Sequence, residues 1–257
     1  MSRLAPAFWA RPFAHRGLHD VKDGRPENSL AAFDAAIAGG YAIELDVQAS
    51  ADGEAMVFHD YEMARLTGQA GRLDAHTAAD LHGIDLLGGG TIPDLETVLR
   101  RIDGRVPVLI EIKDQTGAFG PTVGGPTEGG LERRVCEVVR GGGQGDACAI
   151  MSFNPYSVLA VKTGAPGVAR GLVSYDFEHP HDAHVPAAHR RALAAMTMAG
   201  EVEADFVSYG AGSLAAPAIV ALRAGGMPVF SWTIRSAEQA RAALARCDQI
   251  TFEGYLP

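Results

Sequence analysis

Short apolar runs alternate with helix-like segments along the whole chain, and this alternation constrains the fold more than any other feature of the sequence. The segments between the runs carry helical patterns, several of which end in Gly, as helix C-termini often do. Eight strands alternating with helices predict a single α/β domain of the (β/α)8 TIM-barrel class, and a doubly wound parallel sheet is the structural alternative. The predicted strands are residues 12–15, 42–47, 106–113, 148–153, 168–175, 204–210, 227–233 and 248–253.

Length and composition suit this fold and exclude several classes of protein. The 257 residues are enough for one barrel domain spanning residues 1–257. A total of 22 Lys and Arg against 31 Asp and Glu gives a net charge of -9, which argues against a nucleic-acid-binding protein. Cys136, Cys148 and Cys247 are far apart and form no Cys-x-x-Cys pair, so they indicate free thiols.

No window of the sequence approaches the ~20 apolar residues needed to cross a bilayer. The N-terminal stretch also lacks the apolar core of a secretory signal. We therefore expect a cytoplasmic protein without stable membrane insertion, and the sequence leaves open whether it forms a homo-oligomer.

Two segments interrupt the alternation of strands and helices. Residues 54–93 carry an additional apolar run, "EAMVFHD", followed by a polar and Gly-rich excursion. Residues 114–130 form a long loop rich in Gly and Pro. Both follow the C-terminal ends of predicted strands, where a barrel carries its substrate-binding loops. Insertions without a function are the alternative for either segment.

Charged side chains gather at the C-terminal ends of two predicted strands. Glu44 and Asp46 lie two residues apart in "IELDV" and therefore point to the same face of their strand, and Glu111 and Lys113 repeat this spacing in "VLIEIK". Buried carboxylates repel one another unless a cation compensates them, and oxygen ligands suit hard divalent ions. We expect the three acids to bind such an ion and Lys113 to bind an anion such as phosphate. Solvated acids and a Lys-Glu ion pair are the alternatives.

Two histidines end apolar runs near these acids. His15 ends "PFAH" and His59 ends "MVFH". Because histidine titrates near neutral pH, the two rings could act as general base and general acid on one anionic substrate. Arg16, beside His15, offers a planar fork that suits phosphate oxygens. A structural role is the alternative for either histidine taken alone.

Other polar and aromatic residues are weaker candidates. Glu27 and Asn28 precede the first helix; Asn28 or Ser29 could cap it while Glu27 reaches the barrel mouth. Trp232 would lie at the mouth, where its indole packs either against a substrate's carbon skeleton or into the core. The histidines of "EHPHDAH", residues 178–184, favour a solvated loop over a metal site.

Several short blocks follow one another along the chain: "AHRG", "PENSLAAF", "IELDVQ", "DGEAMVFHD", "IPDLETVL", "IEIK", "SF" and "SWT". Together they resemble the glycerophosphodiester phosphodiesterase family. The resemblance covers nearly the whole chain, and its first half is the most specific because the combination of blocks matters more than any single one.

This resemblance implies a metal-dependent TIM-barrel hydrolase that cleaves glycerophosphodiesters, which are deacylated phospholipids, into sn-glycerol 3-phosphate and an alcohol. The implied cofactor is a divalent cation, Ca2+ or Mg2+. The resemblance also implies that residues 60–93 are the small insertion that this family places after its second strand. Carried over by position, the implied residues are His15 and His59 as the acid/base pair, Glu44, Asp46 and Glu111 as metal ligands, and Arg16, Lys113, Glu27 and Asn28 around the phosphate.

Three positions depart from the family's usual pattern. The stretch "ITFEGYLP" places Phe252 and Glu253 where Thr and Asp are usual, and Arg235 stands where Asn is usual. We expect these residues to lie at the barrel mouth without contacting the proposed catalytic residues, so that they would affect substrate preference.

The expected reaction uses one histidine to take a proton from the attacking oxygen and the other to protonate the leaving alkoxide. The attacker is either water or the glycerol 2-hydroxyl. One alternative function is a barrel phosphodiesterase acting on another phosphodiester or on a phospholipid headgroup, although the chain has no apolar or basic membrane-docking stretch. Another is a non-catalytic barrel that binds glycerol phosphates, although both histidines, the acids and the lysine are present.

Overall fold

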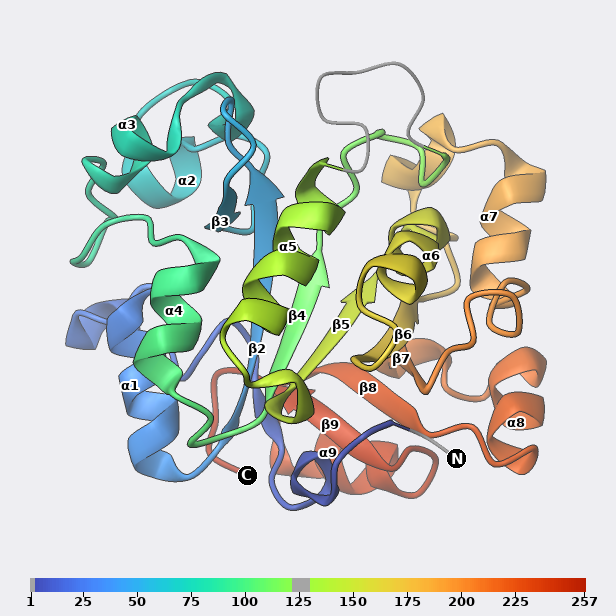
Figure 1. Ribbon diagram of the computed structural model, residues 1–257. Coiled ribbons are helices and arrows are strands. Elements are labelled where there is room, and N and C mark those ends of the chain that lie inside the picture. Colours follow the sequence, from blue (N-terminus) through green and yellow to red (C-terminus); the bar gives the residue numbers. More distant parts are fainter. Residues whose placement is uncertain (1–2, 122–129) are drawn as a thin grey trace.

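The barrel predicted from the sequence is present in the computed structural model, which describes residues 3–121 and 130–257. The loop expected at residues 114–130 therefore lies partly outside the described residues. Eight parallel strands close into a ring in the order β1-β2-β4-β5-β6-β7-β8-β9, because β1 pairs with both β2 and β9 (Figure 1). This closure excludes a doubly wound sheet, which would leave two open edges.

Each predicted strand is found, most of them shorter by one or two residues. A further strand, β3, pairs antiparallel with β2 as a hairpin. The strands are β1 (Phe13–Ala14), β2 (Ala42–Ala49), β3 (Ala55–Val57), β4 (Val108–Ile112), β5 (Cys148–Ser152), β6 (Ala169–Ser174), β7 (Phe206–Gly210), β8 (Val229–Ile234) and β9 (Gln249–Phe252).

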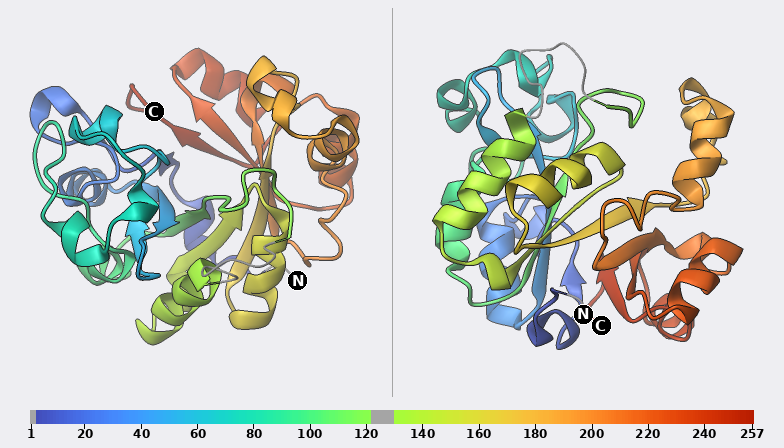
Figure 2. Two further views of the ribbon diagram at one scale, coloured as in Figure 1. Left: turned by 90° about the horizontal axis from the view of Figure 1, so that it is seen from above. Right: turned by 45° about the vertical axis from the view of Figure 1, so that its right-hand side comes forward.

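The helices lie around the outside of the ring (Figure 2). Several begin at a side chain that accepts a hydrogen bond from a free backbone N–H of the first turn: Ser29 before α1, Asp94 before α4, Asn154 before α6 and Ser236 before α9. The α-helices are α1 (Leu30–Gly39), α2 (Ala64–Thr67), α3 (Ala78–His82), α4 (Leu95–Ile102), α5 (Gly130–Gly141), α6 (Pro155–Gly164), α7 (Ala187–Ala194), α8 (Pro217–Ala224) and α9 (Ala237–Leu244).

Alternation along the strands divides the buried side chains between two cores. On β2, Ile43, Leu45 and Val47 pack in the layer between strands and helices. Ala42 faces the barrel interior, which is filled at this level by apolar residues that include Phe13 and Phe206. Gly171 on β6 makes room for the Phe206 ring, since a Cβ at position 171 would lie 2.5 Å from it.

Above this apolar layer the inward positions become polar. Glu44 and Asp46 follow Ala42 on the inner face of β2, and Glu111 follows Leu109 on β4. The interior is therefore closed by hydrocarbon at one end and lined by charge at the other, which is the C-terminal end of the strands.

The expectation that residues 60–93 form a separate small insertion stays a prediction. In the structure this segment contains two short helices, α2 and α3, which the sequence pattern did not reveal. Its apolar side chains form a cluster of their own with two residues of the β3 region, including Phe58, Met63, Leu66, Leu81 and Ile92. This cluster holds the segment over the C-terminal end of β2 (Figure 1).

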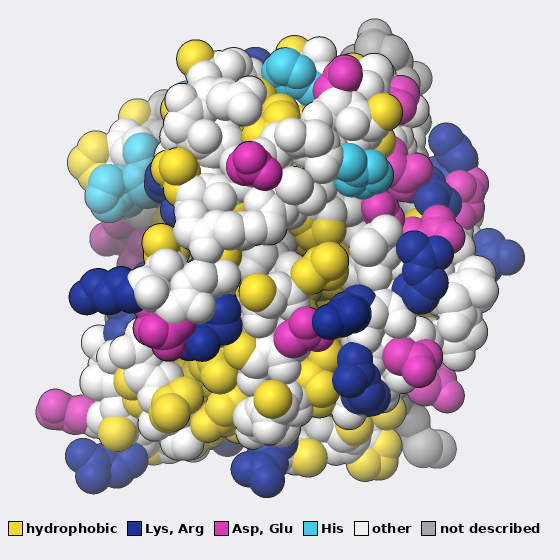
Figure 3. Space-filling model, turned by 90° about the vertical axis from the view of Figure 1, so that its left-hand side faces the viewer, with side chains coloured by type: hydrophobic (Ala, Val, Ile, Leu, Met, Phe, Trp, Pro, Cys, Tyr) yellow, Lys and Arg dark blue, Asp and Glu magenta, His cyan; other side chains and the backbone are white. Residues whose placement is uncertain are grey.

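The molecular surface formed by α1 to α4 carries both signs of charge. Lys and Arg side chains lie among Asp and Glu side chains over this face (Figure 3). Ion pairs also join neighbouring helices, since Arg101 of α4 pairs with Asp34 of α1 and Arg134 of α5 pairs with Glu96 of α4. Within the described part of the chain, no helix has both the length and the apolar character that crossing a membrane requires.

Candidate active site

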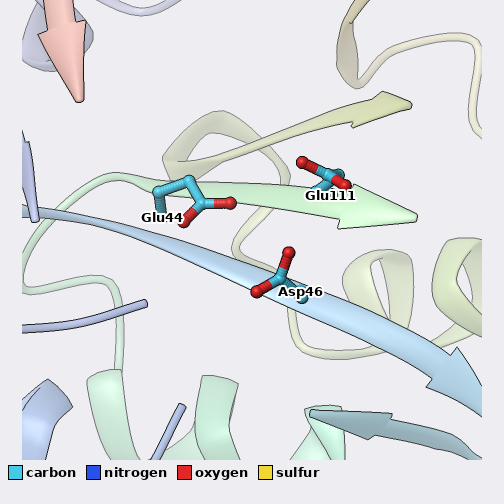
Figure 4. Close-up of side chains that lie close together, drawn as sticks. All are labelled: Glu44, Asp46 and Glu111. Atoms are coloured by element: carbon cyan, nitrogen blue, oxygen red, sulfur yellow. The ribbon is translucent and has the colours of Figure 1, made fainter. Parts of the chain in front are cut away.

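Three carboxylates converge inside the C-terminal end of the barrel. Glu44 and Asp46 reach in from β2 and Glu111 from β4, and their oxygens point into one small space (Figure 4). One oxygen of each lies within 4.8 Å of the others, and all three residues are buried. The strand register explains the grouping, because Asp46 pairs with Glu111 across β2 and β4. The sequence predicted this shared face from the two-residue spacing.

The charge in this group is unevenly compensated. The Lys113 ammonium lies 2.8 Å from Asp46 Oδ1 and 2.6 Å from Glu111 Oε1. Burial lowers the pKa of Lys113, but these two carboxylates outweigh it, so that its net shift is upward and it stays charged. The Lys-Glu ion pair considered from the sequence is therefore present.

Among the described residues, Glu44 has no ammonium or guanidinium group at a comparable distance. It accepts one hydrogen bond, from the backbone N–H of Arg16 at 3.0 Å. Burial, then the neighbouring Asp46 and Glu111, raise the pKa of its carboxyl group well above the ordinary value. Three carboxylate oxygens that converge, one of them with a negative charge that no adjacent cation balances, suit a hard divalent cation such as Ca2+ or Mg2+. Among the described residues this group contains carboxylates alone and no cysteine, so its ligand atoms do not favour a thiophilic metal.

Arg16 and Asn28 border the carboxylates on the side of β1. Asn28 donates from Nδ2 to Asp46 Oδ2 at 2.9 Å, and Arg16 Nε lies 3.4 Å from the same oxygen. Both residues have positive φ angles, and the Asn28 backbone N–H donates to the Arg16 carbonyl. Ser29, rather than Asn28, caps α1, which leaves the Asn28 side chain free to face Asp46.

His15 is held by a carboxylate at the opposite end of the chain. Its Nδ1 lies 2.5 Å from Oε2 of Glu253, and its Nε2 lies 4.0 Å from Glu44. Arg235 donates to the other oxygen of Glu253 at 3.1 Å. The expectation that Glu253 lacks contact with the proposed catalytic residues is therefore wrong, because β9 closes against β1 and brings residue 253 beside residue 15. Arg235 contacts Glu253, so its link to His15 is indirect.

The ionisation of this pair follows from its partners. The hydrogen bond from His15, opposed by burial, brings the pKa of Glu253 to about 2. An ionised carboxylate has no proton to donate, so the Nδ1 atom of His15 carries the proton. Burial lowers the pKa of His15, which favours a neutral ring whose Nε2 can accept a proton.

His59 has an analogous partner in the next residue. Its Nδ1 lies 2.6 Å from Asp60 Oδ1. Burial raises the pKa of the Asp60 carboxyl group, but His59 and Arg65 have a larger, opposite effect, so the net shift of this pKa is downward. Arg65, from α2, donates to both oxygens of Asp60 and to both oxygens of Glu27. Glu27 in turn accepts from Arg16 at 2.6 Å. The sequence analysis did not single out Arg65, because nothing in its local pattern indicates a partner 38 residues away.

One cavity of about 990 Å³ contains both histidines, the three acids, Arg16 and Lys113. Glu27 and Asn28 lie behind this lining rather than on it, and they act on it through Arg16 and Asp46. Trp232 also lines the cavity, on the far side, together with Phe153 and Tyr175, which the sequence analysis did not single out. His179 and His181 lie at its rim; among the described residues they belong to no group with metal-binding geometry.

Comparison with known proteins gives a consistent result. Residues 15–252 match the family model described as the glycerophosphoryl diester phosphodiesterase family. A glycerophosphodiester phosphodiesterase of Bacillus altitudinis is 29% identical over 181 residues, which cover 67% of this chain and 70% of the relative. One from Caldanaerobacter subterraneus subsp. tengcongensis is 33% identical over 169 residues, covering 62% of this chain and 65% of the relative.

Solved structures show the same fold. A phosphodiesterase of Oleispira antarctica, in complex with the product sn-glycerol-3-phosphate, has a TM-score of 0.76 at 22% identity and covers 96% of this chain and 94% of that one. A putative glycerophosphoryl diester phosphodiesterase of Silicibacter pomeroyi has a TM-score of 0.77 at 21% identity, with coverage of 97% and 91%.

Proposed function

The chain belongs to the glycerophosphoryl diester phosphodiesterase family, and from this membership we propose that it hydrolyses glycerophosphodiesters to sn-glycerol 3-phosphate and an alcohol. One observation carries the proposal: two His–carboxylate pairs, three buried acids and two cations surround a single cavity. The bound sn-glycerol-3-phosphate in the Oleispira antarctica relative supports the class of product.

We further propose that Glu44, Asp46 and Glu111 hold a divalent cation, Ca2+ or Mg2+. When bound, such an ion supplies Lewis-acid stabilisation of the negative charge that develops on the phosphate. The support for this ligand set is the convergence of the three oxygens and the under-compensated charge of Glu44.

Arg16 and Lys113 are the proposed phosphate contacts. Both side chains line the cavity and both stay charged. Burial lowers the pKa of the Arg16 guanidinium, but the carboxylates of Asp46 and Glu27 have a larger, opposite effect, so the net shift of this pKa is upward. Glu27 and Asn28 have a supporting role, because Glu27 orients the Arg16 guanidinium and Asn28 orients Asp46. Preorganised donors of this kind stabilise a phosphoryl transition state without reorganising during the reaction.

His15 and His59 are the proposed acid/base pair. Each ring is fixed through Nδ1 by an ionised carboxylate, which leaves Nε2 to exchange a proton with the substrate. The neutral state favoured for His15 suits it to accept the proton of the attacking oxygen, and His59 then protonates the leaving alkoxide. The attacker is either water or the glycerol 2-hydroxyl, and a search for a cyclic phosphate during turnover decides between them.

The test is release of glycerol 3-phosphate from glycerophosphoglycerol by metal-stripped protein, with Ca2+, Mg2+ and Mn2+ added back separately. We expect release only after metal addition. His15→Ala and His59→Ala should each lower kcat by ~10²-fold or more, because a general acid or base typically contributes 10²- to 10⁴-fold.

His76→Ala is the matched control, since His76 lies in the insertion and does not line the cavity. All three variants should show the far-UV circular dichroism of the wild type. Full activity of both catalytic-site variants would contradict the acid/base assignment, and turnover that is indifferent to metal would contradict the cation site.

A further inference from the structure

A second cavity lies between α6 and α7, which are consecutive helices of the outer layer (Figure 1). Its volume is about 200 Å³, against about 990 Å³ for the proposed active-site cavity. We call it the α6–α7 pocket. Most of its lining is apolar and comes from β6, the two helices and the residues next to them, including Phe153, Pro155, Leu172, Val173, Leu193 and Met196.

The α6–α7 pocket lies where three separate apolar clusters meet. Leu172 belongs to the cluster between the strands and the helices, Val173 belongs to the barrel interior, and Leu193 belongs to a small cluster with Phe177 and Val185. Protein interiors leave few voids larger than a water molecule, because apolar side chains interdigitate. The void at this junction is a place where the chain's own side chains do not fill the apolar layer.

The polar groups that line the pocket are largely committed to the protein itself. The His189 Nε2 atom lies 3.1 Å from the Phe119 carbonyl, and because a carbonyl only accepts, Nε2 donates. The Thr197 hydroxyl donates to the Ala192 carbonyl at 3.3 Å. Among the described residues of the lining, this leaves the Tyr156 hydroxyl as the remaining side-chain donor, and no Asp, Glu, Lys or Arg takes part.

This lining favours one chemical class of ligand. A charged molecule would lose its hydration without gaining a counter-charge, which is costly. An engineered apolar cavity of about 150 Å³ in another protein stays dry and binds benzene. A pocket of about 200 Å³ with a mostly apolar lining therefore suits an uncharged molecule slightly larger than benzene.

We propose that the α6–α7 pocket is a second binding site, which takes an uncharged apolar molecule of about the size of toluene and whose occupancy changes turnover in the active site. The binding part of this proposal does not rest on the proposed function, because the pocket lies outside the group of histidines, acids and cations described above.

Two residues connect the pocket to the active-site cavity. Phe153 lines both cavities, so a ligand in the pocket contacts one wall of the active site directly. His189 lines the pocket and holds the carbonyl of Phe119, whose side chain lines the larger cavity. A ligand that fixes either residue in one of its arrangements shifts the population of active-site conformations.

The binding experiment is calorimetric titration of the full chain with toluene. We expect saturable binding with a Kd of ~1 mM or lower, and a Tm that rises with toluene concentration. Benzylammonium has a similar ring but carries a charge, so it should not bind. Absence of saturable toluene binding would overturn the proposal, and equal binding of benzylammonium would overturn the chemical class.

Variants that fill the pocket locate the bound toluene. Ala192 and Met198 both line the pocket and are half-buried, so Ala192→Leu and Met198→Trp each place additional atoms in the void. Both variants should lose toluene binding and keep the far-UV circular dichroism of the wild type. Ala188→Leu is the matched control, since Ala188 is an exposed residue of α7 that does not line the pocket. Binding that survives in whichever filled variant folds would place toluene elsewhere and overturn the proposal.

Steady-state kinetics tests the connection to the active site. With glycerophosphoglycerol as substrate, saturating toluene should change the KM of the wild type and of Ala188→Leu by ~5-fold and leave that of Ala192→Leu unchanged. An unchanged KM in the wild type would overturn the effect on turnover. If no glycerophosphodiester is hydrolysed, the proposed function fails, and the toluene titration still decides whether the second site exists.

Discussion

The Nδ1 atom of His15 lies 2.5 Å from Oε2 of Glu253, although 238 residues separate them in the sequence. The contact follows from barrel closure, because Ala14 and Phe252, the residues that precede them, are paired across β1 and β9. A His–carboxylate pair is thus built across the seam where the two ends of the chain meet.

Glu253→Gln should lower kcat by ~10²-fold or more with little change in KM, because a glutamine amide can donate to Nδ1 and so stabilise the wrong tautomer of His15. Steady-state kinetics on glycerophosphoglycerol measures this. Glu238→Gln, an exposed acid in the first turn of α9, is the matched control. Wild-type kcat in Glu253→Gln would show that His15 needs no orienting partner.

The same carboxylate predicts a dependence of stability on pH. The pKa of Glu253 is about 2 in the folded protein, against an ordinary value of 4.5. Its contribution to the free energy of unfolding is therefore complete above pH 4.5. Below that pH the unfolded chain binds a proton at Glu253 before the folded protein does, so the contribution declines and is lost as the pH falls through about 2. Urea denaturation between about pH 5 and pH 2 should show a shallower loss of stability in Glu253→Gln than in the wild type. Parallel curves would contradict this.

Arg65 connects the insertion to both halves of the site. It binds Asp60, which holds His59, and Glu27, which holds Arg16. We expect Arg65→Met to lower kcat/KM by up to ~10²-fold, because a small misplacement of catalytic groups is costly. The unfolding free energy should change by less than ~1 kcal/mol, since the guanidinium is half exposed and solvent screens its ion pairs.

Arg72→Met is the control for Arg65→Met, because Arg72 lies in the same segment and its ion pair is with Asp74. Arg65→Lys should recover part of the activity but not all of it, since a lysine cannot span both carboxylates with a bidentate fork. If Arg65→Met and Arg72→Met behave alike, the link between insertion and active site has no catalytic role.

Glu44→Gln should have opposite effects on stability with and without metal. In chelator-treated protein the neutral amide removes a buried charge repelled by Asp46 and Glu111, so Tm should rise above that of the wild type. Added Ca2+ or Mg2+ should stabilise the wild type by about 2.7 kcal/mol at a concentration 100 times Kd and the variant much less. Calorimetry with Glu201→Gln as a surface control measures both, and equal metal responses would remove Glu44 from the ligand set.

The barrel and the inner face of its strands could be predicted from local sequence patterns. Eight apolar runs separated by helical patterns leave few other folds, and strand periodicity is a local property of the backbone. The two-residue spacings of Glu44 with Asp46 and of Glu111 with Lys113 were therefore sufficient to place these side chains together.

The partners that orient the proposed catalytic residues could not be predicted in this way. Glu253 reaches His15 only because β9 closes on β1, and Arg65 reaches Glu27 only because the insertion packs over the end of β2. These contacts depend on barrel closure, loop packing and side-chain rotamers, and none of these is encoded in a local pattern of residue types.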